Sequence, residues 1–223
     1  MSIALTWKLR RVSDRSYHRI LFAIAVILLL SELYKQLFHF YVMDNKTYDW
    51  WIFPFQLCSL PMYLCAILPF MKKSRWLIPL ETFLMDFNLL GCLMALLVPD
   101  GLMHPYITLT LHAFVWHFLL LFVGFFIGFS RHGDTSLSGF IKTLPILLIC
   151  IGAATLLNVL FHSYGDINMF YISPYKITTQ PVFSQIMKRT GIWVSNLIYI
   201  TAMCIAAFLI HRMFATIRQS CEK

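Results

Sequence analysis

Cys58 lies between two prolines in the run FPFQLCSLPMY, residues 53–63, at the head of an otherwise apolar segment. A cysteine becomes a nucleophile when a neighbouring imidazole or a helix N-terminus stabilises its thiolate. Pro54 is typical of a first helical turn, so Cys58 is predicted within a turn or two of a helix N-terminus, where the partial positive charge is greatest. A buried cysteine also behaves as a small apolar side chain, and the sequence leaves both roles open.

Two histidines follow in the stretch LHAFVWH, residues 111–117. His112 and His117 are five residues apart, about 140° around a helix, so their imidazoles point in different directions. This spacing does not suit a shared metal ion, unlike HExxH, and no His/Cys group has structural-zinc spacing. We therefore predict no metal and no cofactor. One imidazole is expected at a reaction centre and the other at a neighbouring helix or loop, although an interhelical hydrogen bond would also explain either.

Ionisable side chains within apolar runs cost about 2.5–3.5 kcal/mol at the bilayer centre, and they usually face a cavity or a partner. Glu32 is predicted either to pair with Lys35, nearly one turn on, or to have a functional role. Asp86 and Asn88 are predicted to line a wet cavity or to join helices by hydrogen bonds. Asp100 follows a proline where another apolar run ends.

The composition identifies a membrane protein. Of the 223 residues, 59% are hydrophobic and 13% charged, against about 25% charged in soluble domains. The net charge of +8 does not indicate nucleic acid, because the cations occupy short segments between apolar runs, as in polytopic proteins. The first apolar run continues past Leu30 without a cleavage site, so we expect it to be retained as a span.

A membrane span needs about 20 mostly apolar residues. The sequence therefore predicts an all-α polytopic bundle of six transmembrane helices. They cover residues 18–41, 52–70, 76–98, 106–129, 139–161 and 191–212. We expect one transmembrane domain over residues 1–223, with a short basic leader at 1–17 and a basic tail at 213–223.

Lys and Arg gather in the leader, the second and fourth loops and the tail, which places both termini in the cytoplasm. Cys58 then lies roughly 9 Å below the outer interface, with His112 roughly as deep and His117 roughly 16 Å deep. Cys58, Asp100 and the two histidines are thus predicted in the outer half of the bilayer.

Several short motifs, taken in order, give the sequence a family resemblance. They are Ser31-Glu32, FPFQLC with Cys58, VPD with Asp100, His112 with His117, and NMFY from Asn168 to Tyr171. In this order they resemble the YwaF-like family of bacterial integral membrane proteins, which is related to eukaryotic transmembrane protein 164 and, more remotely, to androgen-induced membrane hydrolases. Two departures stand out. Gln56 replaces the histidine that usually precedes Leu-Cys, and the family's additional N-terminal span is expected to be missing, its place filled by a partner or a lipid.

The resemblance implies acyl chemistry on membrane lipids. Cys58 would be the nucleophile and His117 or His112 its base. Asp100 would orient an imidazole or hold a turn, and Gln56 or Asn168 would donate to an oxyanion. Substrate contacts are expected from these two residues and from Glu32, Asp86, Asn88 and Tyr171.

The rival hypothesis is a binding or transport protein whose cavity is lined by Glu32, Asp86, Asn88 and the histidines. A third is a bundle whose polar residues only join helices. The expected localisation is the cell membrane, with several passes. The expected partners are membrane phospholipids and not nucleic acid, and a homo-oligomer is left open.

Overall fold

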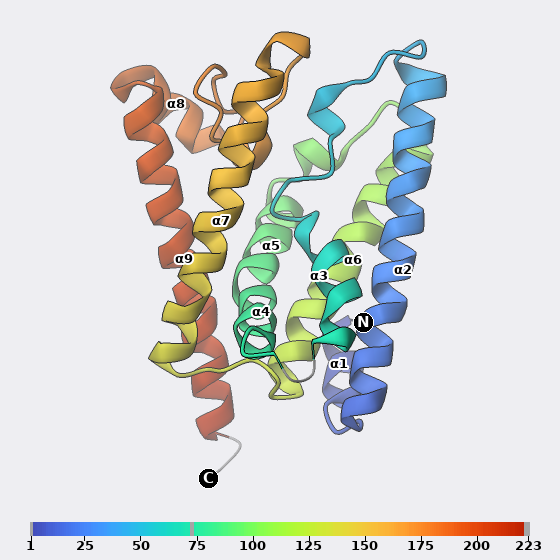
Figure 1. Ribbon diagram of the computed structural model, residues 1–223, viewed down its shortest axis with the longest axis vertical. Coiled ribbons are helices and arrows are strands. Elements are labelled where there is room, and N and C mark those ends of the chain that lie inside the picture. Colours follow the sequence, from blue (N-terminus) through green and yellow to red (C-terminus); the bar gives the residue numbers. More distant parts are fainter. Residues whose placement is uncertain (1, 72–73, 221–223) are drawn as a thin grey trace.

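The computed structural model describes residues 2–71 and 74–220, and all regular secondary structure within them is helical (Figure 1). Five helices are long and apolar enough to cross a membrane, so the chain is a multi-pass membrane protein. They are Asp14–Met43 (α2, Asp14–Phe38, continued by the π-helix His39–Met43), Leu77–Leu97 (α4, Leu77–Phe83, the π-helix Leu84–Asn88 and α5, Leu89–Leu97), Ile107–Phe129 (α6), Leu137–Tyr164 (α7, Leu137–Phe161, and a 3₁₀ turn His162–Tyr164) and Ile192–Ser220 (α9).

The predicted span at residues 52–70 does not form one continuous helix. A 3₁₀ turn at Trp50–Ile52 is followed by seven residues without regular α-helix, then by α3, Leu60–Ile67, and the 3₁₀ turn Leu68–Phe70. The prolines of this segment explain the interruption, because a proline inside a helix removes a backbone donor and clashes with the preceding turn. Where six full-length spans were predicted, the described part of the chain contains five long apolar helices and one half-length helix, Leu60–Phe70.

We call residues 53–59 the open segment, and polar side chains from elsewhere in the chain bond backbone carbonyls of this segment and of the adjoining Ile52. Trp116 donates its indole N–H to the carbonyl oxygen of Cys58 at 3.1 Å, and Gln36 donates its side-chain N–H to that of Ile52 at 2.9 Å. The hydroxyl of Tyr63 donates to the carbonyl of Pro54 at 3.0 Å. Non-helical backbone at membrane depth is tolerated where protein surrounds it or where it lines a cavity. The open segment is thus held by specific contacts.

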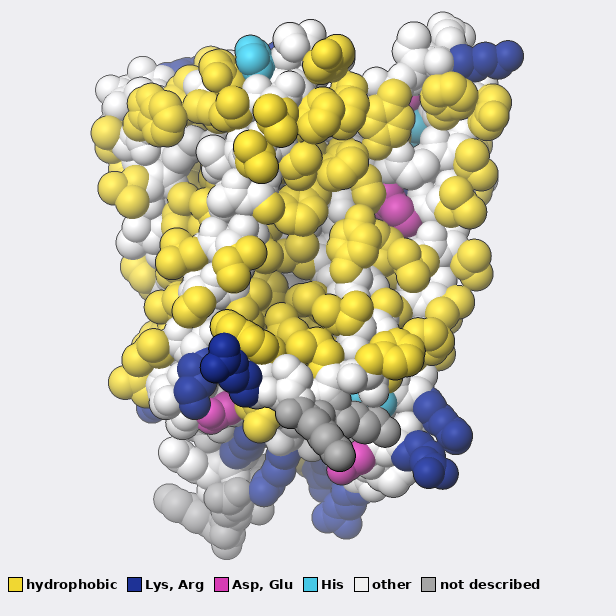
Figure 2. Space-filling model, in the orientation of Figure 1, with side chains coloured by type: hydrophobic (Ala, Val, Ile, Leu, Met, Phe, Trp, Pro, Cys, Tyr) yellow, Lys and Arg dark blue, Asp and Glu magenta, His cyan; other side chains and the backbone are white. Residues whose placement is uncertain are grey.

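Two spans form the centre of the bundle. The most apolar stretch of Leu77–Leu97 has 56% of its residues buried inside the bundle, and that of α6 has 50%. The corresponding share is 22% for the span that contains α7 and 22% for α9. The outer helices expose large apolar side chains, among them Leu148 and Leu160 on α7 and Leu197 and Leu209 on α9. Figure 2 shows the resulting apolar belt around the middle of the visible face. This pattern suits helices that face lipid.

The two ends of the bundle differ. Helix α1, Ser2–Leu9, packs against α6 at the lower end, where α9 also finishes, and α8, Pro181–Thr190, lies at the upper end (Figure 1). On the visible face, Lys and Arg side chains gather mainly below the apolar belt (Figure 2). The expected leader at 1–17 thus contains a helix and the start of α2, and the expected tail continues α9 to Ser220.

Candidate functional site

A cavity of about 610 Å³ lies between the open segment, α5, α6, α9 and the loop before α8. It brings together five of the predicted site residues, which are Gln56, Cys58, Asp100, His117 and Tyr171. Much of the rest of its wall is apolar, with side chains such as Leu90, Met94, Phe183 and Met203. We call it the Cys58 cavity. An apolar cavity with a few converging polar groups is the usual form of a small-molecule or lipid site.

Cys58 lies in the turn before α3, and its backbone carbonyl is fixed by Trp116. It is half-buried, and it is the one cysteine among the described residues that lines the cavity. Cys65 and Cys92 are buried in the core, and Cys150 and Cys204 are half-buried on α7 and α9. The sixth cysteine, Cys221, is outside the described residues. Among the described cysteines, Cys58 is therefore the one whose side chain a ligand in this cavity could reach.

His117 is the predicted base that lines the cavity. Its Nδ1 lies 2.7 Å from the carbonyl oxygen of Ala113, one turn earlier on α6. A carbonyl can only accept, so Nδ1 carries the proton, and in the neutral ring Nε2 keeps its lone pair. The side chain is only 6% exposed. This is the tautomer that a general base needs at Nε2.

His112 lies elsewhere. Its Nε2 donates to the carbonyl oxygen of Ser31 on α2 at 3.1 Å, and its ring centroid lies 6.1 Å from that of Tyr34. It does not line the Cys58 cavity. The 140° offset expected from the spacing thus places one imidazole in the cavity and the other against a neighbouring helix.

The loop after α7 covers part of the cavity, and Gln56 holds it there. The Gln56 amide donates to the carbonyl of Asn168 at 3.1 Å and accepts from the backbone N–H of Phe170 at 2.8 Å. From below, the buried Asn158 on α7 forms two hydrogen bonds with the backbone of Met169, at 3.0 and 2.6 Å. Sequence analysis missed Asn158, whose signal was an amide near the end of an apolar run.

Asn168 and Tyr171 have different roles in this loop. The buried Asn168 accepts from the backbone N–H of Ser173 at 2.9 Å and does not line the cavity, whereas Tyr171 does. Phe170 and Tyr171 both adopt left-handed backbone conformations, at φ 58° and 59°, which non-glycine residues rarely do. Burial raises the pKa of Tyr171 to about 12, so its hydroxyl stays protonated near neutral pH and can donate a hydrogen bond.

Asp100 lies in the 3₁₀ turn Pro99–Leu102, where it is exposed and lines the cavity. Within the described part of the chain it forms no hydrogen bond with His112 or His117. Two roles were predicted for Asp100, holding the turn between two spans and orienting an imidazole. Its position in the 3₁₀ turn favours the first role.

The remaining predicted residues form contacts within one helix or between helices and do not line the Cys58 cavity. Glu32 forms an ion pair with Lys35 at 2.9 Å and accepts from Gln36 at 2.6 Å. Asp86 lies 2.9 Å from Nδ1 of His211 on α9, with both side chains buried, and Asn88 donates to the carbonyl of Leu120 at 3.0 Å. These contacts match the structural alternatives that the sequence had left open.

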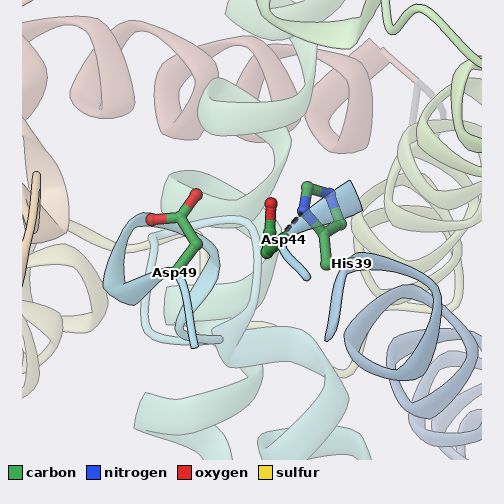
Figure 3. Close-up of side chains that lie close together, drawn as sticks. All are labelled: His39, Asp44 and Asp49. Carbon is green, nitrogen blue, oxygen red and sulfur yellow. Dashed lines mark hydrogen bonds and ion pairs between the residues drawn. The ribbon is translucent and has the colours of Figure 1, made fainter. Parts of the chain in front are cut away.

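A second polar group lies near the top of α2, where sequence analysis predicted no metal. Ligand atoms of His39, Asp44 and Asp49 all lie within 4.8 Å of one another and could hold a metal ion (Figure 3). His39 Nδ1 lies 3.3 Å from Asp44, and Asp49 accepts from the backbone N–H of Trp51 at 2.9 Å. These hydrogen bonds also account for the proximity of the three side chains without a metal ion, as parts of a hydrogen-bonded turn. Its sequence signal was the spacing H-x4-D-x4-D.

The sequence matches the TMEM164 family over residues 1–212. No curated protein and no solved structure matches it.

Proposed function

The chain belongs to the TMEM164 family, and from this membership and the cavity at Cys58 we propose that it transfers or hydrolyses acyl chains of membrane lipids. The observation that carries the proposal is that Cys58 and His117 line one apolar cavity. Such a cavity suits an acyl chain, and its two polar groups are those that thioester chemistry needs. The family resemblance implies the same chemistry.

The first step would form an acyl-enzyme. His117 Nε2 takes the thiol proton of Cys58, and the thiolate attacks the ester carbonyl carbon of a lipid. As the S–C bond forms and the ester C–O bond breaks, the imidazolium returns its proton to the departing alkoxide oxygen. The products are a lysolipid and a thioester on Cys58.

The second step would release the chain. A hydroxyl of a second lipid, or water, gives its proton to His117 and attacks the thioester carbonyl. As the new C–O bond forms and the S–C bond breaks, the His117 imidazolium returns its proton to the Cys58 thiolate. A lipid acceptor makes the protein an acyltransferase and water makes it a hydrolase. We assign the oxyanion donor to the Tyr171 hydroxyl, because Tyr171 lines the cavity whereas Gln56 already bonds the loop through both ends of its amide.

The site is proposed to face the outer half of the bilayer. The cavity includes α8 residues and lies toward the end opposite α1. The cations of the leader and tail favour a cytoplasmic position for the α1 end. An ester entering from the outer leaflet would therefore reach His117 at mid-depth.

Detection of the thioester on Cys58 would test this proposal. Purified protein in mild detergent is incubated with a phospholipid that carries an isotope-labelled acyl chain, and intact-protein and peptide mass spectrometry locate the adduct. We expect a hydroxylamine-labile acyl group on Cys58, absent in Cys58→Ser and present in Cys150→Ser, a matched half-buried cysteine outside the cavity.

A lipid-binding protein without chemistry is the rival, and the same cavity favours it. It would retain labelled lipid non-covalently in wild type and in Cys58→Ser alike. Retention without a thioester or acyl transfer would reject the enzyme and support the binding protein.

A further inference from the structure

The loop between α2 and the open segment brings together three side chains that can bind a metal ion. His39 lies in the π-helix that ends the first span, Asp44 follows this helix directly, and Asp49 precedes the 3₁₀ turn Trp50–Ile52. One ligand atom of each residue lies within 4.8 Å of those of the other two, and Figure 3 shows Asp44 between His39 and Asp49. We call these three residues the loop cluster.

Hydrogen bonds do not account for the negative charge of the loop cluster. Asp44 and Asp49 bring two carboxylates together, and neither forms an ion pair with a Lys or Arg of the described residues. Lys46 lies in the same turn, but its side chain is exposed and pairs with neither of them. Even a protonated His39 would offset only one of the two charges. Because carboxylates at this separation repel each other, a divalent cation between them would be stabilising.

The distance between His39 and Asp44 suits two ligands of one metal ion. Nδ1 of His39 lies 3.3 Å from Oδ2 of Asp44, whereas a charge-assisted hydrogen bond measures about 2.7–2.9 Å. Two tetrahedral ligands, each about 2.0–2.2 Å from a zinc ion, lie about 3.4 Å apart. This pair therefore has the spacing of two ligands, and a side-chain rotation would bring Asp49 to the same ion.

Asp49 is already oriented as a ligand would be. Its Oδ1 accepts from the backbone N–H of Trp51 at 2.9 Å, which leaves the other carboxylate oxygen for an ion. Ligating carboxylates usually have such an outer hydrogen bond, which fixes their orientation.

A second imidazole lies beside the loop cluster. The ring centroid of His104 is 6.3 Å from that of His39. Thr110 on α6 bonds both backbone polar groups of His104, at 2.9 and 3.2 Å, and the His104 ring itself forms no hydrogen bond with the described residues. Its nitrogen lone pair is therefore available to a cation.

These ligand types select the class of metal. Imidazole together with carboxylate suits Zn²⁺ and similar transition metals, whereas Ca²⁺ and Mg²⁺ prefer oxygen ligands. With three protein ligands, a zinc ion keeps a fourth position for water or for a further imidazole.

We propose that His39, Asp44 and Asp49 bind one Zn²⁺ ion, with water or His104 as the fourth ligand. The ion would join the end of α2 to the turn that leads into the open segment, and it would hold the start of that segment in place. The inference does not depend on catalysis at Cys58, because none of the three ligands lines the Cys58 cavity.

Zinc binding by the full chain in mild detergent tests this site. The protein is stripped with a chelator, Zn²⁺ or Ca²⁺ is titrated against its Tm, and bound zinc is counted by elemental analysis. Asp44→Asn removes one ligand and keeps the shape of the side chain. The matched control is Asp166→Asn, which removes an exposed carboxylate from the loop after α7. Cys58→Ser is a second control, because thiolates also bind zinc.

We expect one zinc ion per chain, and a rise in the Tm of wild type and of both controls at Zn²⁺ concentrations where Ca²⁺ has no effect. Asp44→Asn should need at least about tenfold more Zn²⁺ for the same shift, since even loss of an outer hydrogen bond has an effect of this size. Asp49→Asn repeats the test if Asp44→Asn does not fold. No bound zinc, an equal response to Ca²⁺, or an unchanged Zn²⁺ requirement in the ligand variant would overturn the proposal.

Discussion

The indole N–H of Trp116 donates to the carbonyl oxygen of Cys58 at 3.1 Å. This bond joins the turn of the proposed nucleophile to the helix that carries His117, the next residue along α6. The two reactive side chains are therefore held relative to each other through backbone and indole, without a direct bond between them. It also explains how a cysteine can be presented from a segment that lacks helical structure.

Replacing Trp116 by Phe should slow acylation while the fold is kept. The ring volume is largely retained, but the Cys58 carbonyl loses its donor, which costs about 1 kcal/mol. The rate of thioester formation should fall several-fold, measured by time-resolved mass spectrometry. An unchanged rate would show that the bond does not position Cys58.

Replacing His117 by Gln should lower the rate of thioester formation by about 10²- to 10⁴-fold, the range for loss of a general base. The matched control is His112→Gln, because His112 bonds Ser31 outside the cavity. Its acylation rate should stay near that of wild type. Equal losses in the two variants would remove His117 from the mechanism.

Asn158→Leu should destabilise the loop that covers the cavity. Two backbone groups of Met169 lose their buried partners, and each unsatisfied group costs about 1–3 kcal/mol. We expect a lower Tm and faster proteolysis within residues 165–180. A lower Tm with unchanged cleavage in this loop would contradict the assigned role.

The buried pair Asp86 and His211 should behave as one unit. Breaking such a pair costs about 3–5 kcal/mol, because one polar or charged group is left without its partner. Asp86→Leu and His211→Phe should each lower stability strongly, and the double variant less than the sum. Additive losses in reversible unfolding would show that the pair is not coupled.

Gly128→Ala should also be destabilising. A Cβ at this position would lie 2.2 Å from the ring of Phe214, whereas at Gly152 it would meet nothing within 4 Å. Overpacking typically costs about 1–3 kcal/mol. Gly152→Ala is the control and should keep or slightly raise the Tm. Equal Tm values for the two variants would mean that α9 moves aside at Phe214.

Much of the architecture follows from apolar runs, because lipid requires long helices with internally satisfied backbones. The prediction of a full second span was wrong in detail, because apolar length alone cannot show where Pro54 and Pro61 open the backbone. The family membership was predicted correctly from ordered motifs. The joining of Gln56 to Asn168, 112 residues away, could not be predicted, because nothing local to either residue selects its partner. For Cys58 and His117 the sequence predicted a common half of the bilayer, at different depths, and could not show that both line one cavity.

The open backbone of residues 53–59 also has a consequence for biogenesis. A nascent chain that reached only this segment would carry unbonded peptide groups into the membrane. The carbonyl of Cys58 gains its donor only after Trp116 on α6 has been synthesised, and the side-chain amide of Gln56 gains its partners only after the loop at Asn168 to Phe170 has been synthesised. The half-length helix should therefore settle into the bilayer only after the later spans have been made, and chains truncated before residue 166 should be held by the insertion machinery or degraded.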